Sequence, residues 1–309
     1  MNSKKPILAV IMGPTASGKS ELALRLAEHF NGEIISADSM QIYKGLDIGT
    51  AKPSRSEMKT VRHHLVDLYD ITEKLDVYRF LELAESAVSN IHSQGKLPIL
   101  AGGTGFYIRS MLYGLDTLPG NENIRAELDA KYDNPEGFEE LKKLMKECDP
   151  EDFKRWEKHQ RKLIRALEVF TITGKSITEL QTLDKPQLNY RTICWNLCWE
   201  RDELRKRIEL RTEKMLKAGW IEEAENAINA GILETPTAHQ VLGYREINEY
   251  LNGKTDYQTM QQRIVTRTWQ YARRQITWFK NQHPQAKVIH MPAQYQILRE
   301  KFTSELESI

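Results

Sequence analysis

The segment GPTASGKS, from Gly13 to Ser20, constrains the fold of this chain more than any other feature of its sequence. It matches the Gly-x4-Gly-Lys-Ser pattern of a P-loop, whose backbone N–H groups and following helix N-terminus surround phosphate oxygens. The apolar run ILAVIM before it is typical of a strand buried on both faces of a parallel sheet. After it, SELALRLAEHFNG places Leu22, Leu26 and Phe30 at helical spacing. A strand, a glycine loop and a helix in this order predict a phosphate-binding loop rather than a simple turn.

Strand and helix patterns alternate through the rest of the first hundred residues. EIISAD at 33–38 and LPILAGGTG at 97–105 are strand candidates, and 77–95 between them is a helix candidate that Gly95 closes. Because strand, helix and strand in this order form βαβ units, we predict an α/β fold with a P-loop NTPase-like parallel sheet core.

The pattern changes after the turn LPGNEN. Helical periods with many charges follow it, and the next strand candidate is RTICWNLCWE at 191–200. The remainder is mostly helical, with DELRKRIELRTEKMLKAGWIEEAENAINAG as its clearest segment and AKVIHM as a last strand candidate. We therefore predict a catalytic core formed by 1–118 and 192–309, an inserted helical domain at 119–191 and a helical C-terminal region.

Composition and charge exclude several classes of protein. The chain has 309 residues, 40% of them hydrophobic and 28% charged, with a formal net charge of +1. No apolar run approaches the length of a membrane span and the N-terminus shows no cleavage site, so we expect a cytoplasmic protein without membrane association. We also expect a monomer. The three cysteines form no CxxC pair, which argues against a disulfide framework or a structural zinc site. His63, His64 and Asp67 alone are a weak metal signal.

An acidic residue ends one of the predicted strands. Hydrolytic P-loop enzymes usually carry an acid at the end of another strand, where it helps to hold Mg²⁺, but LPILAGGTG ends without one. EIISAD ends in Asp38, which we expect at the carboxyl edge of the sheet, beside the phosphates. Two interpretations stay open at this point: Asp38 as an indirect Mg²⁺ ligand or helix cap, and Asp38 as a general base.

Seven segments together resemble one family. They are GPTASGKS, ISADSMQIYKGLDIGTAKP, HHLVDLYD, AGGTGFYIRSMLYGL, RALEVFTITGKSITEL, VLGYREI and RRQITWF, and they follow one another over nearly the whole chain. In this order they resemble the bacterial tRNA dimethylallyltransferases, also called tRNA isopentenyltransferases. The resemblance implies transfer of a dimethylallyl group from dimethylallyl diphosphate to the exocyclic N6 amine of the adenosine just 3′ of the anticodon. The P-loop would then hold a diphosphate that leaves from carbon.

The resemblance also implies roles for the residues of the P-loop and of two other motifs. Asp38 is implied as the base that accepts the proton of the adenine amine as the C–N bond forms. Thr104 and Arg211 are implied beside the diphosphate, where fixed polar groups stabilise the charge that develops on it. Mg²⁺ is the implied cofactor, held through the hydroxyl of Ser20. The implied diphosphate-binding residues are Gly13, Pro14, Thr15, Ala16, Ser17, Gly18, Lys19 and Ser20.

The implied partner is the anticodon loop of tRNA, from which the target adenine must be drawn out of its stack. The resemblance places tRNA contacts in segments spread over the chain. They are Asp38, Ser39, Met40, Gln41, Thr104, Arg125, Arg161, Lys162, Leu163, Ile164, Arg165, Gln240, Val241, Leu242, Gly243, Tyr244 and Arg245.

The segment 257–285 contains no acidic residue. Its arginines and lysine alternate with aromatic residues in a way that would suit an RNA backbone, although the aromatics can equally be core residues and the arginines a solvated face. Arg273 and Arg274 are adjacent and so point about 100° apart around a helix, and we expect one of them to contact tRNA while the other packs. The residues concerned are Arg263, Arg267, Trp269, Tyr271, Arg273, Arg274, Trp278, Phe279 and Lys280.

Three other functions compete with this interpretation. A small-metabolite kinase would use the P-loop for ATP, but the basic C-terminal third would then have no purpose. An adenylate isopentenyltransferase would act on a free nucleotide, against which the helical insertion and the arginine-rich C-terminus argue. An RNA-binding protein whose P-loop only senses nucleotide would leave Asp38 and Thr104 without a role.

Overall fold

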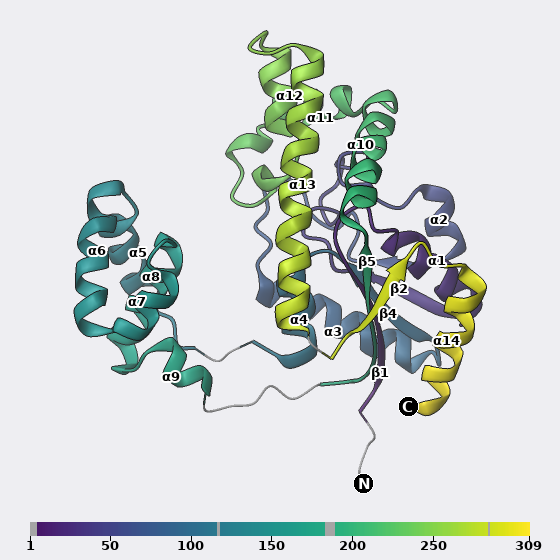
Figure 1. The fold of residues 1–309 in the computed structure, drawn as a ribbon, viewed down its shortest axis with the longest axis horizontal. Helices are drawn as coiled ribbons and strands as arrows, with labels where there is room; N and C mark the ends of the chain where they lie inside the picture. The colour runs from purple at the N-terminus through teal and green to yellow at the C-terminus, as the bar shows by residue number, and fades with distance from the viewer. Residues whose placement is uncertain (1–4, 116–117, 183–188, 284) are drawn as a thin grey trace. The chain divides into compact units, whose positions relative to one another are not determined.

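A computed structural model describes residues 5–115, 118–182, 189–283 and 285–309. The chain forms two compact units (Figure 1). Unit 1 comprises 1–113 with 188–309, and unit 2 comprises 114–187. The boundaries predicted from the sequence lie within five residues of these, at 118/119 and 191/192. Each unit is described by itself.

Unit 1 is built on a parallel sheet, which confirms the predicted α/β fold. Its strands are β1 (Ile7–Met12), β2 (Gly32–Ser36), β3 (His63–His64), β4 (Leu97–Gly102), β5 (Arg191–Trp199) and β6 (Lys287–Met291). Their order is β3-β2-β4-β1-β5-β6, and every neighbouring pair is parallel. The sequence did not predict β3, because two residues are too short to show an alternating pattern.

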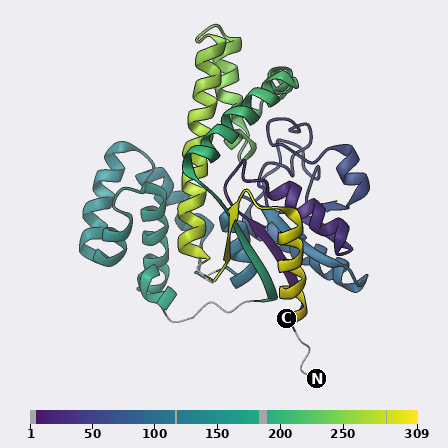
Figure 2. The same ribbon diagram turned by 45° about the vertical axis from the view of Figure 1, so that its right-hand side comes forward.

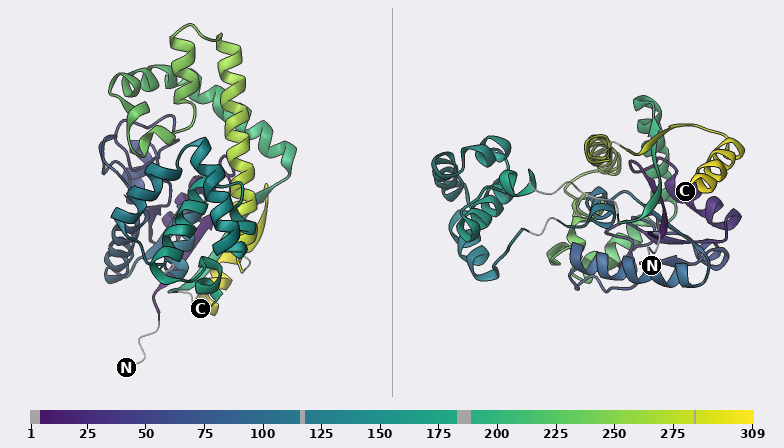
Figure 3. Two further views of the ribbon diagram at one scale, coloured as in Figure 1. Left: turned by 90° about the vertical axis from the view of Figure 1, so that its left-hand side faces the viewer. Right: turned by 90° about the horizontal axis from the view of Figure 1, so that it is seen from below.

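The strand β1 is buried on both faces, as its continuous apolar run requires. Leu8, Val10 and Met12 pack into one hydrophobic cluster, and Ala9 and Ile11 pack into another on the opposite face. Helices cover both clusters: α3 (Val77–Ser93) contributes to the first, and α1 (Lys19–His29) and α14 (Tyr295–Ser308) contribute to the second. Figure 3 shows α3 in blue and α14 in yellow on opposite sides of the strands.

Three long helical elements of unit 1 lie near one another. The helix α13 (Tyr257–Gln282) begins after Asp256, whose side chain accepts a hydrogen bond from the Thr259 N–H, and it packs against α10 (Arg201–Lys217) and α12 (Tyr244–Leu251) (Figure 2). The long helical segment expected around 202–231 is two helices, because Gly219 adopts φ 99° between α10 and α11 (Trp220–Asn229). The other helices of unit 1 are α2 (Arg55–Thr60), α4 (Gly105–Tyr113), α11 (Trp220–Asn229), η1 (Ile232–Glu234) and η2 (Ala238–Gln240).

Unit 2 is helical throughout its described elements, with a core of its own. Leu141, Met145, Leu163 and Val169 are fully buried in that core. The helices are α5 (Glu122–Tyr132), α6 (Pro135–Cys148), α7 (Pro150–Trp156), α8 (Gln160–Thr173) and α9 (Ile177–Thr182).

The sheet order determines which loops meet in unit 1. The strands β2, β4 and β1 are neighbours and parallel, so the loops after them leave the same edge of the sheet side by side. These loops carry Asp38, Thr104 and the P-loop. The carboxyl edge of an open parallel sheet is where α/β proteins usually bind their ligands.

Candidate active site

The P-loop connects β1 to α1 through a backbone that only small residues can follow. Gly13 has φ 149°, and a Cβ atom there would lie 2.8 Å from the carbonyl oxygen of Leu197. Gly18 has φ 90° and stands directly before the first residue of α1, Lys19. The loop therefore brings backbone N–H groups to the N-terminus of α1, an arrangement that attracts anions.

Lys19 is the cation of this loop, and its charge is poorly solvated. Its Nζ donates a hydrogen bond to the carbonyl oxygen of Pro14 at 2.7 Å. Burial and the neighbouring Arg211 guanidinium lower the pKa of Lys19 to about 7, and only Asp38 opposes this shift. Near neutral pH the amine is thus ready to take up a proton when an anion arrives.

Three side chains of β5 and α10 hold the P-loop. Arg207 Nε donates to the carbonyl oxygen of Ala16 at 2.8 Å, and Trp199 Nε1 donates to that of Ser17 at 2.9 Å. Arg211 donates to the Thr15 hydroxyl oxygen at 3.2 Å. The resemblance suggested Arg211, but sequence reasoning missed the other two, although the four-residue spacing of 207 and 211 places both on one face of α10.

Asp38 and Thr104 lie on adjoining loops. The Ser39 N–H donates to the Thr104 hydroxyl oxygen at 3.1 Å, and the Thr104 N–H donates to the carbonyl oxygen of Ala37 at 3.1 Å. One carboxylate oxygen of Asp38 accepts from the Met40 N–H at 2.9 Å. The second oxygen of Asp38 has no hydrogen bond within the described part of the chain, so the carboxylate keeps an acceptor for a ligand.

A cavity of about 460 Å³ joins these groups to the helices α10 and α13. It brings together twelve of the residues that the sequence analysis singled out. They are Thr15, Ala16, Asp38, Ser39, Met40, Thr104, Arg211, Gln240, Val241, Leu242, Tyr271 and Arg274. Apolar side chains complete the wall, among them Ile208, Met215 and Trp220. A wall that combines charged and polar groups with apolar side chains suits a substrate that is charged at one end and hydrocarbon at the other.

A second cavity of about 770 Å³ borders the P-loop at residues 16–20. Lys19 and Ser20 line it, and Ala16, Arg211 and Met215 line both cavities. Gly13 and Pro14 are buried and line neither.

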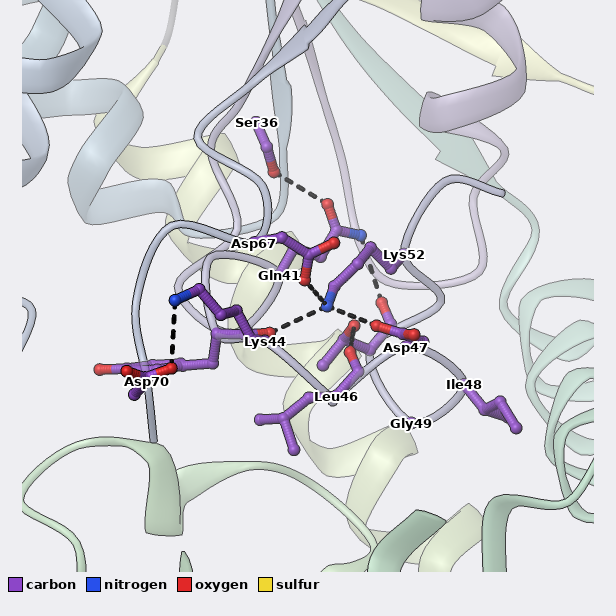
Figure 4. A network of polar contacts seen from close by, with 12 residues as sticks. Ser36, Gln41, Lys44, Leu46, Asp47, Ile48, Gly49, Lys52, Asp67 and Asp70 are labelled. Carbon is purple, nitrogen blue, oxygen red and sulfur yellow. Dashed lines mark hydrogen bonds and ion pairs between the residues drawn. The ribbon is translucent and has the colours of Figure 1, made fainter. Parts of the chain in front are cut away.

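The segment after Asp38 is fixed by an internal polar network rather than left open (Figure 4). The Lys52 ammonium group, with a side chain only 2% exposed, contacts Asp47 at 2.6 Å, Asp67 at 2.5 Å and the carbonyl oxygen of Tyr43 at 2.9 Å. Sequence reasoning gave Lys52 no role. As an isolated buried cation it would be costly, and with three acceptors it joins three parts of the loop.

Gln41, predicted as a tRNA contact, belongs to the same network. Its amide oxygen accepts from the Ser36 hydroxyl at 2.8 Å, and its amide nitrogen donates to the carbonyl oxygens of Thr50 and Ala51 at 3.2 Å (Figure 4). The side chain therefore supports the loop in this structure.

The predicted tRNA segment at 240–245 contains both exposed and buried residues. Gln240 and Arg245 are exposed, whereas Val241, Gly243 and Tyr244 are buried. The Tyr244 hydroxyl donates to Glu223 at 2.7 Å, and Glu223 also accepts from the backbone N–H groups of 47, 48 and 49. Only the exposed side chains of this segment are placed to contact a large ligand.

Two arginines of the helix α13 form ion pairs with α12. Arg263 pairs with Glu249 at 2.6 Å, and Arg267 pairs with the buried Glu246 at 2.7 Å. Both acids belong to α12, outside the acid-free stretch. Of the four aromatics, Phe279 is fully buried and the other three are partly buried.

The expectation that one of Arg273 and Arg274 packs is wrong. Both are exposed, because α13 uses Ala272, Gln275 and Phe279 for its buried face. Arg274 lines the 460 Å³ cavity, with its guanidinium 5.7 Å from the centre of the Tyr271 ring.

The predicted tRNA contacts in unit 2 surround a buried glutamate. Glu168, whose side chain is 0% exposed, forms an ion pair with Arg165 at 2.6 Å and accepts a hydrogen bond from Arg125 at 2.9 Å. Leu163 and Ile164 are buried in the helical core. Arg161 and Lys162 are exposed, so they are the side chains of the segment 161–165 that are most accessible to a ligand.

Two absences hold for the described residues. No group of three or more histidine, cysteine, aspartate or glutamate side chains among them could hold a metal ion. Within the same residues, no helix combines the length and the apolar character needed to cross a membrane.

Comparison with known proteins identifies relatives over most of the chain. The family model described as IPP transferase matches residues 41–282. A tRNA dimethylallyltransferase of Geobacter sulfurreducens is 40% identical over 297 residues, which cover 94% of each chain. Among solved structures, a tRNA delta(2)-isopentenylpyrophosphate transferase of Staphylococcus epidermidis superposes with a TM-score of 0.73 at 32% identity, covering 98% of this chain and 99% of that one.

A more distant structure has the same fold. A eukaryotic dimethylallyltransferase acting on tRNA superposes with a TM-score of 0.78 at 27% identity, covering 93% of this chain and 74% of that one. Fold, sequence and the arrangement of the loops thus agree, and the chain belongs to the IPP transferase family.

Proposed function

We propose that this chain is a tRNA dimethylallyltransferase: it transfers a dimethylallyl group from dimethylallyl diphosphate to the N6 amine of the adenosine 3′-adjacent to the anticodon and releases diphosphate. The observation that carries the proposal is the 460 Å³ cavity, because Asp38, Thr104 and Arg211 line it together with the P-loop residue Thr15. A leaving-group site and a carboxylate thus face one space. We further propose that the enzyme acts as a monomer in the cytoplasm.

The diphosphate would bind along the P-loop, where the 460 Å³ and 770 Å³ cavities share Ala16 and Arg211 and where Lys19 lines the larger one. As the bond between the allylic carbon and oxygen breaks, negative charge grows on the bridging oxygen. Lys19, Arg211 and the loop N–H groups stabilise that charge in a poorly hydrated site, where fixed dipoles act more strongly than in water. The lowered pKa of Lys19 shows that its charge is not already satisfied within the protein.

Mg²⁺ fits this site as an ion held mainly by its substrate. The Ser20 hydroxyl is exposed on the wall of the 770 Å³ cavity, beside Lys19, and the described residues offer no cluster of three ligating side chains. Mg²⁺ commonly binds through one or two protein oxygens together with substrate phosphates and water. When bound, it would neutralise part of the diphosphate charge.

Asp38 would act on the amine. The N6 lone pair is delocalised into the adenine ring, so the amine is a weak nucleophile. Asp38 accepts a proton from N6 while the new C–N bond forms, and Thr104 holds the neighbouring loop through the Ser39 N–H. The exposed Arg273 and Arg274 and the exposed members of 161–165 and 240–245 would contact the tRNA backbone.

One assay separates this proposal from its rivals. The chain is incubated with labelled dimethylallyl diphosphate and either unmodified tRNA or AMP, and in parallel with labelled ATP and candidate metabolites. We expect label in tRNA alone. Label in AMP would indicate a free-nucleotide enzyme, and ATP-dependent labelling of a metabolite would indicate a kinase.

Asp38→Asn tests the base. Asparagine keeps an oxygen for the Met40 N–H but cannot accept the proton, so the single-turnover rate should fall by about 10²–10⁴ while tRNA affinity changes only a few-fold. A near-normal rate in this variant would remove Asp38 from that role.

A further inference from the structure

Gln275 connects two loops that the proposed reaction must keep in register. It lies in α13 and is only 5% exposed. Its amide oxygen accepts from the Thr15 N–H of the P-loop at 2.8 Å, and its amide nitrogen donates to the carbonyl oxygen of Gly103 at 2.8 Å. One side chain thus binds the backbone of the loop after β1 and that of the loop after β4.

The chain of contacts continues from both ends of this amide. Thr15 also accepts a hydrogen bond from Arg211 through its hydroxyl oxygen. Gly103 precedes Thr104, whose hydroxyl oxygen accepts from the Ser39 N–H next to Asp38. Gln275 therefore lies between the groups that hold the leaving diphosphate and the groups that hold the base.

The chemistry of the amide suits this place. Thr15 presents a donor and Gly103 an acceptor, and a glutamine side chain offers one acceptor and two donors at once. A carboxylate of the same length cannot donate, and a thioether can do neither well. The fit is also tight, since a Cβ atom on Gly103 would lie 2.4 Å from Gln275 Nε2.

We propose that Gln275 is a positioning residue that sets the distance between the diphosphate loop and the loop of Thr104 and Asp38. The inference rests on the proposed function and deepens it. Reacting groups must meet within a narrow range of distance and angle, and a displacement of about 1 Å can cost about 10²-fold in rate. Gln275 itself touches no reacting atom.

The test uses two variants that break the same connection from opposite sides. Gln275→Met keeps the length of the side chain and removes both hydrogen bonds, whereas Gly103→Ala displaces the amide from its partner. For each we expect the single-turnover rate at saturating substrates to fall by about 10- to 100-fold. Dissociation constants for tRNA and for a non-reactive thio analogue of dimethylallyl diphosphate should change by less than about threefold.

Gln270→Met is the matched control, because Gln270 is an exposed glutamine of the same helix. It should leave rate, binding and melting temperature unchanged. If Gln275→Met does not fold, Gly103→Ala and Gln275→Glu test the proposal in its place. Gln275→Glu keeps only the hydrogen bond to Thr15.

Rates within twofold of wild type in a folded Gly103→Ala or Gln275→Glu variant would overturn the inference. So would a loss of rate that disappears at saturating substrate, because that would mark a binding role. A failure of the proposed function looks different: the wild-type chain itself would then transfer no label to tRNA.

Discussion

The cations around the P-loop and the cations of the α5–α8 pair are treated in opposite ways. Lys19, Arg207 and Arg211 have no ion-pair partner within the described part of unit 1, and burial lowers the pKa of Lys19 and of Arg211. Arg125 and Arg165 in unit 2 share Glu168. Unpaired charge in a cavity costs folding free energy and remains available to an anion, whereas paired charge supports the fold.

Of the variants that test this comparison, we expect Lys19→Met to have the largest effect on activity and stability. Removing a fixed donor from a leaving-group site should lower the transfer rate by about 10²–10³ and weaken binding of dimethylallyl diphosphate. The same change should stabilise the fold by about 0.5–2 kcal/mol below pH 7, because a poorly solvated charge is lost.

The pH dependence of that stabilisation follows from the lowered pKa of Lys19. The folded pKa of Lys19, about 7, is below its ordinary value of 10.5, so protonation is disfavoured in the folded state. The free-energy cost of holding this charge in the folded protein has its full value below pH 7, and it decreases as the pH rises toward 10.5. Melting temperatures of wild type and Lys19→Met at pH 6 and pH 9.5 measure it, with the exposed Lys254→Met as control. A variant that is equally active, or less stable at pH 6, would contradict the comparison.

Glu168→Ala should act on stability in unit 2. It leaves two arginines without their carboxylate, and we expect a loss of about 2–3 kcal/mol, below the value for fully buried pairs because both arginines keep contact with water. Hydrogen exchange of α5 and α8 in the full chain measures the loss. Glu139→Ala removes an exposed ion pair with Lys142 in the same unit and should cost less than about 0.5 kcal/mol.

Lowering the pH should destabilise unit 2 through the same carboxylate, Glu168. Burial opposes ionisation of Glu168, but hydrogen bonds from Arg165, the Asn121 N–H and Arg125 outweigh it and lower its pKa. The stabilisation is therefore present above the unfolded value of 4.5 and is lost as the pH falls below it. Unchanged protection in Glu168→Ala, together with weaker tRNA binding, would show that the two arginines serve RNA rather than the fold.

Local patterns predicted the P-loop and its neighbours. The apolar run, the glycines and Lys19 lie within fourteen consecutive residues, 7–20, and β1 and α1 form where the sequence indicates. Asp38 could also be predicted at the sheet edge, because the apolar run of β2 ends just before it. Backbone geometry that depends on residues adjacent in the sequence can be predicted from such local patterns.

Contacts between distant segments could not be predicted by the same means. Gln275 is 260 residues from Thr15, and Arg207 is 191 from Ala16. The acid-free stretch of α13 suggested five free cations, but the packing of α12 brings acids to two of them, Arg263 and Arg267. A count of charges along the sequence cannot show which cations a neighbouring helix neutralises.

The smallest effect, and the sharpest division within one helix, concerns Arg274 and Arg263. Arg274 is exposed at the cavity wall without an ion-pair partner in the described chain, whereas Arg263 is paired with Glu249. A phosphate contact releases counterions, so Arg274→Ala should raise the Michaelis constant for tRNA a few-fold and reduce the log–log salt slope of binding by about 0.7–0.9. Arg263→Ala should leave the slope unchanged, since a paired arginine has little free charge to offer. Binding of each variant at several salt concentrations, with thermal melts to check folding, measures the difference. Equal slopes for both variants would mean that the ion pairs of α12 and α13 open on binding RNA, and that the whole helix rather than its C-terminal half contacts the phosphate backbone.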